Sequence, residues 1–95
     1  MLTAAEQRLI DRLRARLADV GLLAVVETAA LEHHVTVEDV LLAGRTRNVA
    51  AARRDSIVAL YVYNNRSQPE IATLLGLDRT TVMHHLHAAN IRSKR

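Results

Sequence analysis

Residues 69–86 read PEIATLLGLDRTTVMHHL, and this stretch decides the fold. Ser67 precedes it and Pro69 opens it, an order typical of a helix start, because serine caps the first turn and proline there loses no hydrogen bond. Gly76 ends this short helix. Asp78 is placed to cap the next one. Two short helices joined by a three-residue turn have the layout of a helix-turn-helix, the alternative being a helical hairpin that happens to have a polar first turn.

The composition of the 95-residue chain predicts a compact all-α domain. Three glycines and one proline are too few for the many turns of a β-sandwich or barrel. Two tyrosines, without Phe or Trp, leave the core to Leu, Val, Ile and Ala. The absence of cysteine excludes disulfides, thiolate zinc sites and cysteine nucleophiles. No apolar run approaches ~18 residues and no secretory signal is present, so we expect a cytoplasmic protein without membrane association.

The first third of the chain predicts an N-terminal amphipathic helix. Thr3 and Glu6 have the spacing of a capping box that starts it. Its apolar stripe includes Leu9, Leu13 and Leu17. Gly21 then either kinks one long helix or forms a corner between two helices. We divide the chain there, into an N-terminal helix over 1–21 and a helix-turn-helix domain over 22–95.

The apolar stripe of the N-terminal helix is too short to form a core of its own, and an isolated helix of this length is marginal in water. It must therefore pack on the rest of the domain, on a second copy in a homodimer, or on a partner protein.

The middle of the chain predicts two more helices. Thr36 and Asp39 offer a capping signal for a short helix that Gly44 ends. A basic loop follows, and Asn48 is a good N-cap for a long helix over about 49–63.

The charge is unevenly distributed. Residues 1–43 hold four arginines and seven acidic residues, a net charge of −3, whereas residues 44–95 hold nine basic and three acidic residues, a net charge of +6. A basic half of this kind favours a polyanionic partner, the alternative being a solvated basic face.

The first turn of the last helix has side chains that suit base edges. Arg79 can donate two hydrogen bonds to guanine or one to a phosphate. Thr80 and Thr81 each offer a methyl group for thymine and a hydroxyl for a base or phosphate. Asp78 can accept a hydrogen bond from cytosine or only cap the helix. These residues predict a helix that reads the major groove of DNA.

Four motifs carry a family resemblance. They are Val35-Thr36-Val37-Glu38-Asp39 followed by Arg45-Thr46-Arg47; Val49-Ala50 leading through Arg53-Arg54 to Leu60-Tyr61; Ser67-Gln68-Pro69-Glu70-Ile71; and Asp78-Arg79-Thr80-Thr81-Val82-Met83-His84. With these motifs, residues 22–89 resemble the C-terminal DNA-binding domain of DnaA, the bacterial replication initiator. The resemblance implies a helix-turn-helix of the DnaA C-terminal, Trp-repressor-like type.

The resemblance also implies a set of DNA contacts. Arg45 would reach into the minor groove with Arg47 nearby; Arg53, Arg54 and the backbone N–H groups around Gln68 and Pro69 would hold phosphates; Asp78, Arg79, Thr80 and Thr81 would face base edges and the adjacent backbone; and His84 would lie at or near the DNA surface.

The chain departs from the family pattern in three places. The turn before Asp78 is shorter and lacks the family's arginine, and Arg79 stands where the family has histidine, which changes the base it can read. No Gly-rich phosphate loop is present, so the ATPase module of an initiator is missing. The chain is similar to a stand-alone or phage-type relative of the one domain.

We therefore expect a sequence-specific double-stranded DNA-binding protein that regulates replication initiation or transcription in a bacterium or phage, associated with the nucleoid. The alternative is a protein-interaction module that docks through its N-terminal helix and modulates a replication initiator or regulatory partner. No arrangement of residues indicates an enzyme, and we expect no nucleotide or other cofactor. His84 and His87 share a helix face, but no carboxylate lies close in sequence, so we expect no metal.

Overall fold

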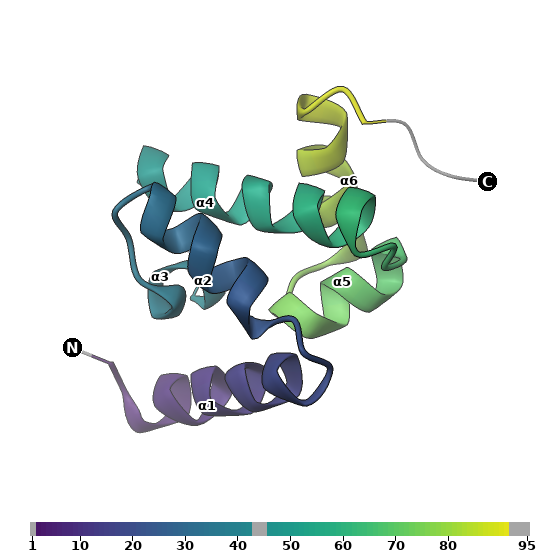
Figure 1. Cartoon of the computed structure of the whole chain (residues 1–95). Coiled ribbons are helices and arrows are strands. Elements are labelled where there is room, and N and C mark those ends of the chain that lie inside the picture. The colour runs from purple at the N-terminus through teal and green to yellow at the C-terminus, as the bar shows by residue number, and fades with distance from the viewer. Residues whose placement is uncertain (1, 43–45, 92–95) are drawn as a thin grey trace.

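The computed structural model describes residues 2–42 and 46–91, and within them every regular element is helical. The elements, shown in Figure 1, are α1 (Ala4–Asp19), α2 (Leu23–Glu32), α3 (Val37–Leu41), α4 (Arg47–Val58), the π-helical turn η1 (Ala59–Tyr63), α5 (Gln68–Leu75) and α6 (Arg79–Ala88). The predicted all-α class is confirmed.

The first two helices meet at a corner. Gly21 adopts the left-handed conformation, with a φ of 74°, and its N–H donates to the carbonyl of Ala18. The sequence left open whether Gly21 kinks one long helix or separates two helices, and the structure has two separate helices. The capping box of Thr3 and Glu6 that starts α1 is present as predicted.

The apolar stripe of α1 packs inside the molecule. Ile10, Leu13 and Leu17 are buried in the same cluster as the rest of the core, and α1 contacts α2, α3 and α5. Leu9, which we had placed in this stripe, is instead 39% exposed. The predicted division of the chain at residue 21 therefore falls at a turn between two helices. Residues on both sides of it belong to one core, and α1 is part of that core.

Helix α4 is central to the fold. It contacts α2 and α3 on one side and α6 on another, and it continues directly into η1 (Figure 1). Its N-cap is Thr46, whose hydroxyl accepts from the N–H of Val49, so the prediction of Asn48 as the cap was wrong. Both residues are good caps, and the helix starts two residues earlier than predicted, which makes Thr46 the cap.

The last turn of the long helix is widened. The N–H of Asn64 donates to the carbonyl of Ala59 at 3.1 Å, five residues earlier, which is the π-helical pattern. This turn places Tyr61 in the core at 4% exposure and Tyr63 outside at 82%. It brings the chain round to the start of α5.

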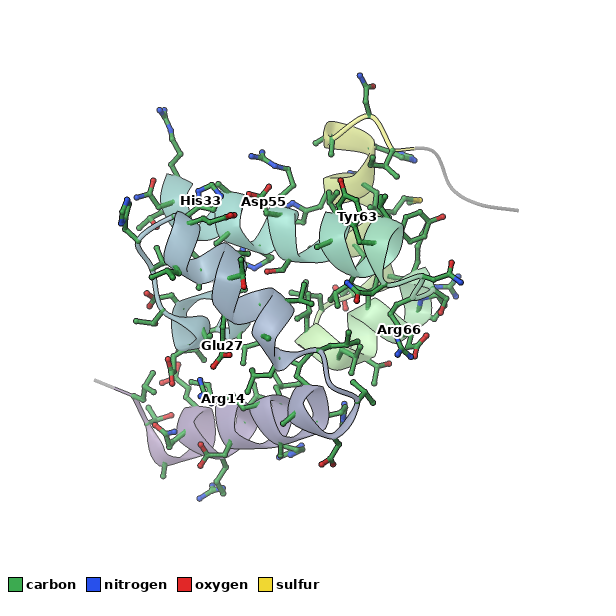
Figure 2. The ribbon with its side chains drawn as sticks, in the orientation of Figure 1. Arg14, Glu27, His33, Asp55, Tyr63 and Arg66 are labelled. Carbon is green, nitrogen blue, oxygen red and sulfur yellow. The ribbon has the colours of Figure 1, made fainter. Side chains whose placement is uncertain are left out.

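Polar contacts between helices hold the packing. His33 Nε2, at the end of α2, lies 2.6 Å from Asp55 Oδ2 on α4, and Figure 2 shows the two side chains together. Arg14 Nη1 on α1 lies 3.2 Å from Glu38 Oε2 on α3. Each pair is partly exposed, so each contributes modestly to stability.

Candidate nucleic-acid interface

The turn between α5 and α6 has the geometry expected from its sequence. Ser67 Oγ accepts from the N–H of Glu70 at 3.3 Å, and Pro69 lies in the first turn of α5. Gly76 ends the helix in the left-handed conformation, with a φ of 68°. The connection to α6 is the predicted three residues. The Glu70 carboxylate, three residues after Ser67, accepts a hydrogen bond from Arg66 Nη1 at 2.9 Å.

The first turn of α6 presents polar side chains to solvent. Asp78, Arg79 and Thr80 are exposed and Thr81 is half-buried. Asp78 occupies the N-cap position, but its carboxylate makes no capping hydrogen bond. The next turns are anchored by residues on the opposite face, of which Val82 and Leu86 are buried. The exposed turn is thus held on a packed helix.

Three of the predicted contact residues share a surface pocket. Gln68 and Pro69 at the start of α5 and Arg79 at the start of α6 line a hollow of about 370 Å³. Tyr61, Asn65 and Arg66 contribute the rest of its wall, together with Ser67. One expectation is corrected here: Pro69 has no N–H group, so within the Gln68–Pro69 pair only Gln68 has a backbone donor.

Arg53 does not lie where a phosphate contact requires. Its side chain is 6% exposed, and Nε and Nη2 each donate to the carbonyl of Val40, both at 3.2 Å. Burial lowers the pKa of the Arg53 guanidinium. The expectation of a surface Arg53 was wrong: the resemblance implied its role, but in this chain the guanidinium holds α3 against α4.

Arg54 and His84 lie on the surface where α4 and α6 meet. Both are exposed, and both lower the pKa of His85, a half-buried residue of α6. Burial lowers the pKa of the His85 imidazole, and the positive charges of Arg53, Arg54 and His84 lower it further. The predicted phosphate contact Arg54 and the predicted surface histidine His84 thus belong to two helices that contact each other, α4 and α6.

One more basic residue of the prediction, Arg47, lies at the start of α4. Arg47 is the first residue of that helix and is exposed. It shares a helix face with Arg54, since seven residues make about two turns. Arg45 and Gly44 lie outside the described residues.

Sequence reasoning missed Arg66 and His85. Arg66 lies directly before the Ser67 cap and beside the start of α5, as Figure 2 shows. A basic residue immediately before a helix N-cap was the available signal. His85 carried no sequence signal, because its importance comes from the arginines of α4.

Comparison with protein-family models, curated proteins and solved structures found no match to this chain. The likeness to the DnaA domain therefore rests on the sequence motifs. Among the described residues, no group of three or more His, Asp or Glu side chains is arranged to hold a metal ion. None of the helices in residues 2–42 and 46–91 is both long and apolar enough to cross a membrane.

Proposed function

We propose that this protein binds double-stranded DNA sequence-specifically, with α6 as the helix that enters the major groove. The observation that carries the proposal is the exposed first turn of α6, where Asp78, Arg79 and Thr80 project from a helix anchored by buried Val82. Side chains in the first turn of the second helix are those that contact bases in helix-turn-helix proteins.

The surroundings of this turn suit a DNA backbone. Arg66 and Arg79 line the same pocket, and Arg54 and His84 are exposed on α4 and α6, two helices that contact each other. The N-termini of α5 and α6 add partial positive charge. Contacts of this kind position a protein on DNA and supply affinity, whereas the first turn of α6 supplies specificity.

The role we propose is regulation of replication initiation or transcription at the bacterial or phage nucleoid. This follows from the resemblance to the initiator's DNA-binding domain.

The alternative of a protein-interaction module depended on an available apolar stripe in α1. Ile10, Leu13 and Leu17 are buried against the rest of the domain, so this stripe is not a docking surface. DNA binding is therefore the function that the geometry favours.

The proposal is tested by selecting bound duplexes from a random pool and then titrating salt with a selected duplex. We expect the selection to enrich one sequence. In the titration, the logarithm of the binding constant should fall linearly with the logarithm of the salt concentration, with a slope of ~0.9 for each phosphate that the protein neutralises. Arg8→Ala is the matched control, because Arg8 is an exposed arginine on α1, away from the proposed interface. No duplex binding at low salt overturns the proposal.

A further inference from the structure

The exposed face of α6 extends past the first turn that the proposed function uses. The helix has three large apolar residues. Val82 and Leu86 are buried and fix its inward side, whereas the side chain of Met83 is 39% exposed. The core therefore leaves Met83 accessible for a contact outside the chain, on a helix whose other exposed residues are mostly polar.

Met83 lies on the same side of α6 as two residues proposed to read bases. It follows Arg79 by four positions and Thr80 by three, and both of these residues are exposed. Residues at these spacings are neighbours on the surface of a helix. Long side chains of a helix also lean toward its N-terminus. We therefore expect the Met83 side chain to extend toward the first turn, beside Arg79 and Thr80.

The chemistry of Met83 differs from that of these two neighbours. Arg79 and Thr80 carry hydrogen-bond donors, whereas the thioether of methionine offers an apolar, polarisable and flexible surface. In the major groove, the apolar feature of a base pair is the C5-methyl group of thymine, and proteins read it by apolar contact. A methionine within reach of the base edges is therefore suited to thymine.

We propose that Met83 is a specificity-determining residue that packs against the C5-methyl group of a thymine in the DNA target. The inference rests on the proposed function, because it requires α6 to lie in the major groove. The helical rise separates Met83 from Arg79 by about 6 Å along the helix axis, which is close to two base-pair steps of B-DNA. We therefore expect this thymine within about two base pairs of the base that Arg79 reads.

The test removes the methyl group from the DNA. In a duplex selected from the random pool, each thymidine is replaced in turn by deoxyuridine, whose base keeps the hydrogen-bonding groups and lacks only the C5-methyl. We expect one such duplex to bind the unaltered chain about fourfold more weakly, which is the effect of one buried methyl group. The same replacement should have no effect on the affinity of Met83→Ala, so that the two changes are not additive.

The neighbouring threonine provides an internal comparison. A methyl group that contacts Thr80 also makes binding depend on a thymine. That dependence should persist in Met83→Ala and disappear in Thr80→Ser, which removes only the threonine methyl. The thymine assigned to Met83 should show the opposite pattern.

Three further variants separate a methyl contact from a general effect. Met83→Leu keeps an apolar side chain and should retain part of the deoxyuridine effect, whereas Met83→Gln keeps the length and should lose it. Leu9→Ala is the matched control, because Leu9 is also 39% exposed, and Figure 1 shows α1 and α6 at opposite ends of the molecule. It should bind thymidine and deoxyuridine duplexes as the unaltered chain does. Thermal unfolding checks that each variant is folded.

Three results would overturn the inference. The first is a deoxyuridine effect of the same size with and without the Met83 side chain. The second is a selected site in which no thymine near the Arg79 base depends on its methyl group. The third is a loss of affinity in Met83→Ala that is equal for thymidine, deoxyuridine and random duplexes, which would show a structural or backbone role.

The inference and the proposed function fail in distinguishable ways. Absence of binding to any duplex at low salt removes the proposed function and the role of Met83 together. Sequence-specific duplex binding that does not depend on Met83 or on a thymine methyl removes only the role of Met83 and leaves the proposed function in place.

Discussion

Leu13 of α1 lies against Gly76, the glycine that turns the chain from α5 toward α6. A Cβ atom at Gly76 would stand 3.1 Å from Leu13 Cδ1, closer than ordinary van der Waals contact. The N-terminal helix therefore supports the turn that positions α6. The first turn of α6 is thus supported by α1, a helix for which the sequence left docking to a partner as one alternative.

Gly76→Ala is expected to destabilise the protein. The alanine must adopt a left-handed conformation, which costs roughly 1–2 kcal/mol, and its Cβ must also displace Leu13. Gly21→Ala is the matched control, because Gly21 has a similar positive φ but open space around its missing Cβ. Urea unfolding should show a larger loss of unfolding free energy for Gly76→Ala than for Gly21→Ala. Equal losses in the two variants contradict a tight contact with Leu13.

Leu17→Ala tests whether α1 belongs to the core. Leu17 is fully buried, and truncating a buried leucine costs about 2–5 kcal/mol. Leu9→Ala removes the same side chain from the same helix at a largely exposed position, and should cost no more than about 0.5 kcal/mol. Denaturant unfolding measures both. A small loss for Leu17→Ala, accompanied by loss of dimerisation, would favour an interaction role for α1.

Arg53→Ala and Arg54→Ala should separate a structural arginine from a DNA contact. Arg53→Ala leaves the carbonyl of Val40 without its donors and should lower the free energy of unfolding by about 1–3 kcal/mol. Arg54→Ala should leave stability nearly unchanged and weaken binding to all duplexes alike, with a salt slope lower by ~0.9. The reverse assignment of the two effects would show that Arg53 is the phosphate contact.

Arg79→Ala should change specificity. If Arg79 reads a base, its loss relaxes the preference at one or two positions of the selected site, by roughly 1–3 kcal/mol. Binding to a panel of single-base variants measures this. Equal weakening on selected and random duplexes would show that Arg79 contacts only the backbone.

The half-buried imidazole of His85 should make stability depend on pH. Because its pKa in the folded protein is lowered from the ordinary 6.5, the folded state binds fewer protons than the unfolded state. The stability that the protein has with a neutral His85 is therefore retained above pH 6.5. It is lost as the pH falls through the lower pKa that His85 has in the folded protein. His85→Gln should lose less stability between pH 7 and pH 5 than the unaltered chain.

The exposed neighbour His87 provides the control for this measurement. His87→Gln should retain the pH dependence of the unaltered chain in thermal unfolding. A pH dependence that is the same with and without His85 would show that its burial is not linked to folding.

The sequence by itself determined the features that depend on near neighbours along the chain. The all-α class, the Thr3 and Ser67 caps, the end of the helix at Gly76 and the three-residue turn were all predicted correctly. Each follows from a side chain or a φ angle that acts within one helical turn. The polar first turn of α6 was predicted for the same reason.

Only the tertiary structure decided what lies opposite each helix face. Arg53 and Arg54 are adjacent and chemically identical, yet one is buried on the carbonyl of Val40 and the other is exposed. The α1 stripe is buried by α2, α3 and α5, and the pocket around Arg66 is formed by residues of η1, α5 and α6. In both cases, elements distant in sequence determine the result. The burial of a side chain depends on the surface of the other element that packs against it. The periodicity of one helix does not predict that surface.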